Sequence, residues 1–381
     1  MAHKPNMPVI GQIIKAAGSG PAQSLSETIK PSPEMPVLIA KRCLRFRHKS
    51  ASCQACVDAC PSDAMRLTGG RIRLNVPSCT ACGACSAVCP TDALHMRRPS
   101  DEDYEAGLAE AKRSGELVFS CGYAAKKPGI RVNCAGSIEL SYFLRAAAEG
   151  VRSVKLVCGA CAKCPRSQKE MNLAETARTL GELAGEFGVP FSVSVERAPK
   201  EVDLSRRRWF GGILRRAGSE SAGKAVPPDP ALARIADEPD RRVPDTRRRL
   251  LNSVKVFAAA APEKTDGSLA AALFAAPKAD GDKCTACGIC ATVCPTEALR
   301  VSNISGSFMI SCVKTHCVAC GLCRDICFMK AITLEPLPRL SEALSETPEV
   351  ILAKGSDDSE EAYSTWEDRL GGMVDVPVYR T

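Results

Sequence analysis

Hydrophobic and polar positions between residues 101 and 198 follow two periods in turn. Short apolar runs typical of strands occur in the stretches GELVFSC, GIRVNC, VRSVKLVC and FSVSVE. Between them, GSIELSYFLRAAAEG and SQKEMNLAETARTLGELAGEFG have apolar residues at helical spacing and end at a glycine. Strands that alternate with helices favour parallel pairing. The pattern predicts a small α/β domain over residues 101–198 with a parallel sheet.

Short β-hairpins are predicted on both sides of this domain. MRLTGGRIRLNV has two alternating runs around Gly69 and Gly70, a strong signal for a two-residue turn. ALRVSNISGSFMISC repeats the pattern around Ser-Gly, and AITLEPL adds a further strand. Each hairpin lies between two cysteine-rich phrases. The fold class is therefore predicted as α+β, with cysteine-rich modules at 35–100 and 278–338 flanking the α/β domain.

The remaining segments are predicted to be irregular. They are an N-terminal tail at 1–34, a linker at 199–277 and an acidic C-terminal tail at 339–381. The linker contains LSRRRWFGGILRRAG, in which Trp209 and other apolar residues share one helical face opposite arginines. Two interpretations stay open for this stretch, docking to an acidic subunit and peripheral contact with a membrane surface. In the acidic tail, Trp366 is a candidate anchor on a partner.

Cysteine is the residue type that changes this picture, with 22 among 381 residues. No secretory signal is visible at the start, and no apolar run reaches the length of a membrane span. A cytoplasmic, reducing location is expected, where clustered cysteines indicate metal rather than disulfides. The formal charge of +8 counts every cysteine as neutral. Because metal-bound cysteines are thiolates and anionic clusters would cancel the excess, no nucleic-acid partner is predicted.

The cysteines follow a phrase that occurs twice in nearly the same form. Residues 78–94 read SCTACGACSAVCPTDAL, and residues 283–299 read KCTACGICATVCPTEAL. In the spacing C-x2-C-x2-C-x3-C-P, three thiolates bind corners of one [4Fe–4S] cluster, and the fourth cysteine binds a second cluster. Zinc sites prefer two CxxC pairs separated by a longer loop. The spacing favours iron–sulfur clusters and requires a partner phrase in each module.

The C-terminal module contains both phrases, and the second has Phe328 where proline is usual. This module resembles a bacterial two-cluster ferredoxin, which implies that fold and one-electron chemistry. By the same resemblance, one [4Fe–4S] cluster is bound by Cys284, Cys287, Cys290 and Cys327. The other is bound by Cys317, Cys320, Cys323 and Cys294.

The N-terminal module is similar to the same family but departs from it at one position. In its first phrase, SASCQACVDACP, Ser50 occupies the place of the first cysteine. Cys43, seven residues earlier, is the candidate for the missing ligand, and a three-iron cluster is the alternative. The stretch RFRH beside it either donates hydrogen bonds to cluster sulfur or carries exposed loop side chains. The proposed sets, which bring the total to four [4Fe–4S] clusters, are Cys43, Cys53, Cys56, Cys89 and Cys79, Cys82, Cys85, Cys60.

Six cysteines lie outside these sets. Cys312 is interpreted as a small buried hydrophobic residue at the end of a strand. The other five belong to the α/β domain, at the carboxyl ends of its predicted strands, where open α/β sheets place their sites. They are Cys121, Cys134, Cys158, Cys161 and Cys164.

The phrases FSCGYAA, VNCAGSIELSYFLRAAAEGV and VKLVCGACAKC resemble the delta subunit of methyl-viologen-reducing hydrogenase. That family carries a two-iron cluster and passes electrons to heterodisulfide reductase or related partners. The resemblance implies one additional [2Fe–2S] cluster bound by Cys121, Cys134, Cys158 and Cys164. The chain departs from the family in having Cys121 alone where a CxxC pair is usual, and Cys161 as an extra cysteine. A redox-silent or zinc-binding spacer is the alternative.

The motifs point to electron transfer rather than to catalysis. No G-x-G-x-x-G follows a strand and no P-loop occurs, so no nicotinamide, flavin or nucleotide site is indicated. The predicted function is that of a non-catalytic relay subunit between an acceptor and a hydrogenase, a formate dehydrogenase or a heterodisulfide-reductase-like unit. Electrons are expected to pass from one module through the α/β domain to the other. A freely diffusing polyferredoxin, and an iron–sulfur enzyme or assembly factor using the middle cysteines, are the alternatives.

Overall fold

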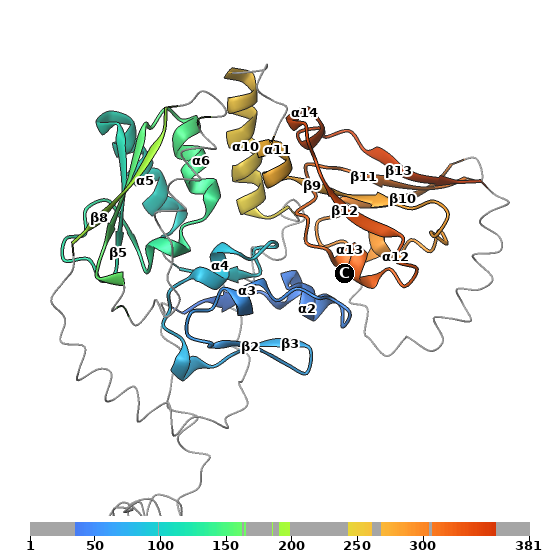
Figure 1. Cartoon of the computed structure of the whole chain (residues 1–381), viewed down its shortest axis with the longest axis horizontal. Coiled ribbons are helices and arrows are strands. Elements are labelled where there is room, and N and C mark those ends of the chain that lie inside the picture. The colour runs from blue at the N-terminus through green and yellow to red at the C-terminus, as the bar shows by residue number, and fades with distance from the viewer. Residues whose placement is uncertain are drawn as a thin grey trace, which may run out of the picture.

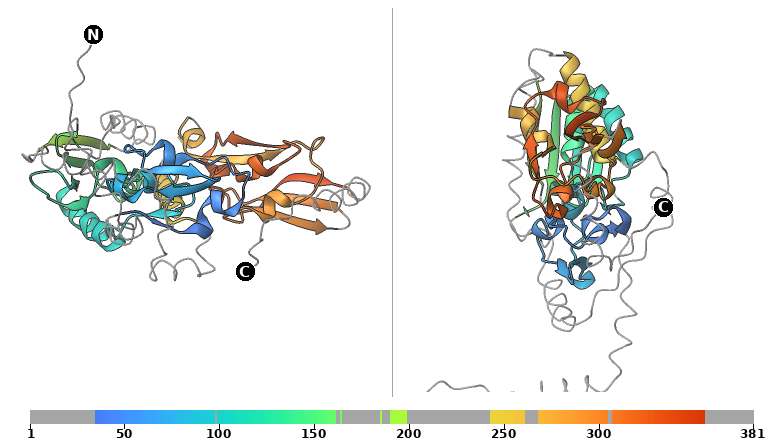
Figure 2. Two further views of the ribbon diagram at one scale, coloured as in Figure 1. Left: turned by 90° about the horizontal axis from the view of Figure 1, so that it is seen from below. Right: turned by 90° about the vertical axis from the view of Figure 1, so that its right-hand side faces the viewer.

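Three folded lobes make up the described part of the chain (Figure 1). The structure is a computed structural model, and it describes residues 35–97, 99–161, 164, 185, 190–198, 243–260, 268–304 and 307–355. Several predicted features lie outside these residues: the N-terminal tail, the helix expected over 167–188, the basic stretch around Trp209 and the acidic segment around Trp366. Seen from below, the N-terminal lobe crosses the middle of the molecule, with the other two lobes on either side (Figure 2).

The N-terminal lobe contains the predicted hairpin. Strands β2 (Met65–Thr68) and β3 (Arg71–Leu74) pair in antiparallel register around Gly69 and Gly70, whose φ angles of 58° and 73° are in the left-handed region that glycine adopts without strain. The chain ends of the lobe meet where β1 (Val37–Leu38) pairs with β4 (Leu94–His95). The rest consists of short helices: η1 (Ala40–Arg42), α2 (Leu44–Arg47), α3 (Ala55–Asp58), η2 (Val76–Ser78) and α4 (Ala84–Ala87).

The middle lobe contains the predicted parallel sheet. Its four strands have the order β6-β5-β7-β8, and all three pairings are parallel. The elements are α5 (Asp101–Ser114), β5 (Glu116–Cys121), β6 (Ile130–Val132), η3 (Ala135–Ser137), α6 (Leu140–Ala148), β7 (Ser153–Cys158) and β8 (Ser192–Arg197). Helix α5 begins with a capping box between Ser100 and Asp103 and ends at Gly115. The core is aromatic and aliphatic, with Tyr104 and Phe119 each 1% exposed.

The C-terminal lobe is larger than the predicted module at 278–338. Strand β9 (Ala275–Ala279) pairs with β12 (Ile332–Pro336), and the hairpin of β10 (Leu299–Ile304) and β11 (Ser307–Cys312) is extended by β13 (Glu349–Lys354). The short helices are α11 (Ser268–Leu273), α12 (Ile289–Thr292), α13 (Leu322–Ile326) and α14 (Leu340–Ala343). The predicted acidic tail therefore starts with ordered structure, because β13 provides the third strand of this sheet.

One helix of the predicted linker joins two lobes. Helix α10 (Asp245–Ala260) lies between α6 of the middle lobe and α11 and α14 of the C-terminal lobe (Figure 1). Its buried residues Leu251, Val254 and Phe257 share one core with Leu144 and Phe274. Burial of such side chains contributes about 1.5–3 kcal/mol each, so this core holds the two lobes together. No helix among the described residues combines the length and the apolar character needed to cross a membrane.

Candidate metal centres

The cysteine set that includes Cys43 lies around one cavity in the N-terminal lobe. Cys43, Cys53, Cys56 and Cys89 all line a space of about 380 Å³. Burial, together with the charges of Cys89 and Cys53, raises the pKa of Cys43 to about 11. Cys56 is affected in the same way by burial and by Cys89, Cys43 and Cys53, with a pKa of about 12. The structure therefore brings Cys43 to the position expected from the sequence.

The loop that carries Cys43 is fixed by Arg45. Its Nε donates to the carbonyl oxygen of Cys53 at 2.6 Å, and its Nη2 donates to that of Ser52 at 3.0 Å. His48 Nδ1 accepts from the N–H of Ser50 at 3.1 Å. These two side chains of the RFRH stretch are partly buried and form hydrogen bonds with the loop backbone, a role that neither interpretation of the stretch predicted. Ser50 itself is exposed, on the outside of the loop.

The second set of this lobe surrounds its own cavity. Cys60, Cys79, Cys82 and Cys85 line a space of about 300 Å³. Burial raises the pKa of Cys85, and the charges of the other three add to this effect, together with that of Cys56. Because Cys56 belongs to the first set, the two sets are adjacent across α3 and α4.

The C-terminal lobe repeats this arrangement. Cys284, Cys287, Cys290 and Cys327 line a space of about 380 Å³. For the other set, burial raises the pKa of Cys323, and the charges of Cys317, Cys320 and Cys294 raise it further. Cys290 also acts on Cys323, so the two sets of this lobe are neighbours too. All sixteen predicted ligands are thus gathered into the four expected groups.

A repeated turn directs backbone N–H groups at the sulfur atoms that end the phrases. The N–H groups of Ala64, Ala93 and Ala331 lie 3.2–3.3 Å from Sγ of Cys60, Cys89 and Cys327, four residues earlier in each case. The residue before each alanine has a positive φ: 51° at Asp63, 47° at Asp92 and 51° at Lys330. Such donors favour the thiolate form that iron binds.

The remaining phrases differ from the first phrase in backbone shape. Ala81, Ala286 and Ala319 have φ angles of 53°, 55° and 49°, and each is followed two residues later by a glycine that precedes a short helix. The first phrase has Gln54 at φ −142° before α3 and no such glycine. This local change accompanies the serine at position 50 and the placement of Cys43 beside Cys53, Cys56 and Cys89.

A single metal ion requires ligand atoms that converge on one point. Over the described residues, no group of three or more His, Cys, Asp or Glu side chains is arranged to hold one ion. A tetrahedral ion with bonds of about 2.3 Å draws its sulfur ligands close together. Here four thiols line each of three shared spaces without converging on one point, and this arrangement fits a cluster of several atoms.

The five middle cysteines gather at one edge of the parallel sheet, as predicted. Cys121 ends β5, Cys158 ends the adjacent β7, and Cys134 follows β6. A hydrogen bond from Cys158 lowers the pKa of Cys121, and a further bond from the Gly159 N–H at 3.3 Å lowers it again. Burial raises the pKa of Cys134 to about 12, and the charges of Cys82, Cys164 and Cys121 raise it further.

Two neighbours complete this middle site. The Arg197 guanidinium at the end of β8 donates to Sγ of Cys161, and the hydrogen bond from Cys158 and the Arg197 charge lower the pKa of Cys161. A Cβ at Gly159 would lie 2.6 Å from the carbonyl oxygen of Tyr123, so only glycine allows the two loops to approach this closely. Arg197 was not predicted from the sequence, because only the parallel register of β7 and β8 places it opposite Cys158.

Direct contacts between lobes connect the sites in a line. The charge of Cys53 acts on Cys320, and Asp325 accepts hydrogen bonds from the Ser52 N–H at 2.7 Å and the Ser52 Oγ at 2.6 Å. Leu44 packs against Leu322 in the same contact. The N-terminal and C-terminal modules therefore meet directly. The expectation that the α/β domain lies between them is wrong.

The α/β domain contacts the other end of the N-terminal module. The charge of Cys82 acts on Cys134, and α4 packs on η3 so closely that a Cβ at Gly83 would lie 2.7 Å from Cβ of Ser137. The resulting order of sites starts at the Cys284 set, continues through the Cys317 set, the Cys43 set and the Cys79 set, and ends at the middle cysteines.

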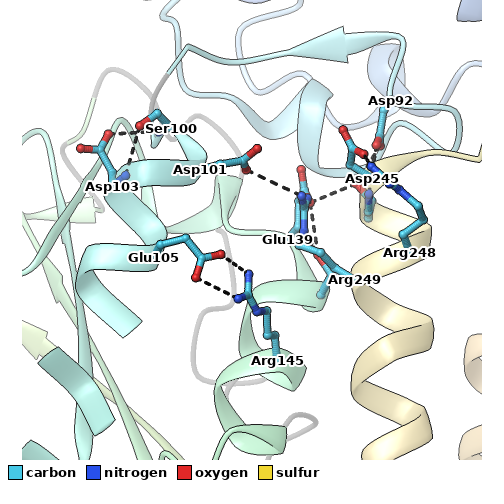
Figure 3. A network of polar contacts seen from close by, with 12 residues as sticks. Asp92, Ser100, Asp101, Asp103, Glu105, Glu139, Arg145, Asp245, Arg248 and Arg249 are labelled. Carbon is cyan, nitrogen blue, oxygen red and sulfur yellow. Dashed lines mark hydrogen bonds and ion pairs between the residues drawn. The ribbon is translucent and has the colours of Figure 1, made fainter. Parts of the chain in front are cut away.

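A buried polar network holds the N-terminal lobe against α10 and the middle lobe (Figure 3). Asp92, three residues after Cys89, accepts from the Thr246 N–H at 3.0 Å and from its Oγ1 at 2.7 Å. Glu139 accepts from Thr246 Oγ1 at 3.0 Å and from Arg249 Nη2 at 2.6 Å. Burial raises the pKa of Glu139, and the Arg249 charge partly offsets this. The network joins the N-terminal lobe, α10 and the middle lobe.

Comparison with known protein families found a 4Fe-4S domain in each of the two predicted modules. Residues 36–90 match the model of a 4Fe-4S dicluster domain, and residues 277–300 match the model of a 4Fe-4S binding domain. Neither match reaches the middle lobe. Searches of curated proteins and of solved structures gave no match. The chain therefore carries ferredoxin-type 4Fe-4S domains on both sides of the middle lobe, which indicate an iron–sulfur electron-transfer role.

Proposed function

We propose that the chain is a relay subunit that passes single electrons between a catalytic oxidoreductase subunit and an acceptor in the cytoplasm. The observation that carries the proposal is the continuous line of cysteine sets, in which each set lies close enough to the next for their charges to act on one another. A carrier of two independent modules would not need the close approach of Cys53 to Cys320 and of Cys82 to Cys134. The catalytic partner would be of the hydrogenase, formate dehydrogenase or heterodisulfide-reductase-like class.

The proposed cofactors are four [4Fe–4S] clusters and one [2Fe–2S] cluster. When bound, each cluster supplies one-electron oxidation and reduction. The sixteen module cysteines would ligate the four-iron clusters in the sets given above. Cys121, Cys134, Cys158 and Cys164 would hold the two-iron cluster, with Cys161 and Arg197 beside it. The residues of the chain fix the spacing between sites and supply hydrogen bonds to sulfur.

The two ends of the line differ in their surroundings, which suits contact with two different partners. At the C-terminal end, Phe328 is 45% exposed and Met329 36% exposed directly after the ligand Cys327. At the other end, the middle site lies at the edge of the sheet beside Arg197. A relay subunit needs one accessible site at each end.

Purification of the full chain without air tests this proposal. Four [4Fe–4S] clusters and one [2Fe–2S] cluster correspond to about eighteen iron atoms per chain, measured as iron and acid-labile sulfide and confirmed by EPR. Size exclusion of native extract should show the chain in a larger complex. Elution near 40.5 kDa without other subunits would contradict the relay role and favour a freely diffusing polyferredoxin.

Combined replacement of Cys158, Cys161 and Cys164 by alanine tests the middle site. We expect the loss of about two iron atoms and of an EPR signal distinct from those of the ferredoxin-type modules, because three of the gathered thiols are removed. Cys312→Ser is the matched control, since Cys312 is a buried cysteine outside every set and a serine hydroxyl can still donate to Cys317 in its place, and its iron content should stay unchanged. Unchanged iron in the triple variant would show that the middle lobe holds no iron. Zinc found there in the unmodified chain would support the spacer interpretation.

A further inference from the structure

Arg247 is a buried cation held rigidly inside the C-terminal lobe. It lies in the first turns of α10, which is outside both ferredoxin-type modules, and only 6% of its surface is exposed. Its Nε donates to the carbonyl oxygen of Thr315 at 3.2 Å, and its Nη2 donates to that of Lys314 at 3.0 Å. The Phe274 ring centroid lies 4.6 Å from Cζ of Arg247. These contacts fix the position of the charge.

Within the described residues, Arg247 has no carboxylate within ion-pair distance. The neighbouring buried cation differs in this respect: Lys314, with 8% of its side chain exposed, pairs with Glu342 at 3.7 Å and also with Glu349. Buried charges are normally paired because desolvation costs several kcal/mol or more. Burial lowers the pKa of Arg247 to about 10, and the charge of Cys317 acts in the opposite direction. Its compensating negative charge must come from another group.

The guanidinium faces the ligand loop of one predicted cluster. Lys314 and Thr315, whose carbonyl oxygens accept these hydrogen bonds, lie three and two residues before Cys317 in the sequence. The charges of Arg247 and Cys317 act on each other, so the guanidinium lies close to this ligand set. Arg45, near the Cys53 set, is by contrast partly exposed and screened by water.

We infer that Arg247 is the positive charge that compensates the cluster bound by Cys294, Cys317, Cys320 and Cys323 and raises its reduction potential above that of the neighbouring sites. This inference rests on the proposed function, since it requires a cluster in that set. Reduction adds one negative charge, and a fixed cation in a low-dielectric interior stabilises that charge. An electron that passes along the line of sites then resides longest at this site, which lies next to the junction between the two modules.

Arg247→Met and Arg247→Lys in the full chain, purified without air, separate charge from structure. Methionine fills the space beside the Phe274 ring but carries no charge. Lysine keeps the charge but lacks the planar set of N–H donors that the guanidinium presents to the two carbonyl oxygens. In an EPR redox titration, the Met variant should show an about tenfold lower ratio of reduced to oxidised cluster at fixed potential, equal to about 59 mV for one electron. Lysine should restore most of this ratio. The affected signal should be the one that Cys320→Ala removes.

Arg248→Met is the matched control. Arg248 is the next residue of the same helix, its side chain is 48% exposed, and it pairs with Asp245, so no signal should shift. A Met variant with full iron content and unchanged ratios overturns the inference. Loss of the cluster in Arg247→Met but not in Arg247→Lys supports it, whereas equal loss in both assigns the role to the fork of hydrogen bonds and overturns it. Absence of iron in the unmodified chain would instead contradict the proposed function itself.

Discussion

Replacing Cys43 by serine is expected to lower the iron content of the anaerobically purified chain by about four atoms, or by about one if a three-iron cluster remains. Cys43 lines the same cavity as Cys53, Cys56 and Cys89, and its loop is fixed there by Arg45. Iron analysis and EPR measure the loss directly. Because this set lies in the middle of the line, electron passage from the C-terminal lobe to the middle lobe should stop as well, which rapid-mixing absorbance spectroscopy can follow.

Two further variants show whether position 43 is the ligand. Cys312→Ser makes the same chemical change at a buried cysteine outside the sets, where the hydroxyl can still donate to Cys317, and should keep all of the iron. Adding Ser50→Cys to the Cys43 variant restores the usual spacing of the phrase, but Ser50 is exposed on the outside of the loop, so we expect no recovery. Recovery of the cluster in the double variant, or full iron in Cys43→Ser alone, would show that Cys43 is not a ligand.

Structural features that depend only on residues close together in the sequence could be predicted. The turn at Gly69 and Gly70 and the parallel strands follow from local patterns, and both are present. The resemblance to two-cluster ferredoxins implied the four groups, each of which combines cysteines of one phrase with one from the partner phrase. Helix α5 was missed although its signals are local: the capping box of Ser100 and Asp103 at the start and Gly115 at the end.

The order of the lobes could not be read from the sequence. It depends on contacts between distant residues, such as Ser52 with Asp325 and Leu44 with Leu322, and no local pattern pairs these positions. Helix α10 was predicted as linker because prolines and arginines surround it. Its apolar residues, Leu251 and Phe257 among them, belong to a core that two lobes share. The sequence of either lobe alone does not indicate this core.

Removal of iron should unfold the N-terminal lobe while the parallel-sheet domain stays folded. The N-terminal core contains Cys56, Cys60 and Cys85 together with a few aliphatic residues, so its interior is organised around the ligand sets. Without metal the thiols are protonated and the cavities of about 300–380 Å³ lose their contents, and the remaining apolar contacts are few. Metal binding and folding are then one process, as in other small metal domains.

The parallel-sheet domain has a core that does not depend on its cysteines. Tyr104, Phe119 and Leu156 are at most 2% exposed and pack between the sheet and its helices. Burying side chains of this size contributes about 1.5–3 kcal/mol each. Its cysteines lie at one edge of the sheet, so their metal can leave without opening the core.

Hydrogen exchange with mass spectrometry, before and after oxidative removal of iron with a chelator, measures this difference lobe by lobe. Protection should be lost over residues 35–97 and kept in β5 and β7. The C-terminal lobe should lose less than the N-terminal lobe, because its sheet of β10, β11 and β13 and the core shared with α10 remain. Full protection of residues 35–97 in the iron-free chain would mean that this lobe folds without its clusters, and its cysteines would then be ligands on a preformed scaffold rather than part of what holds it together.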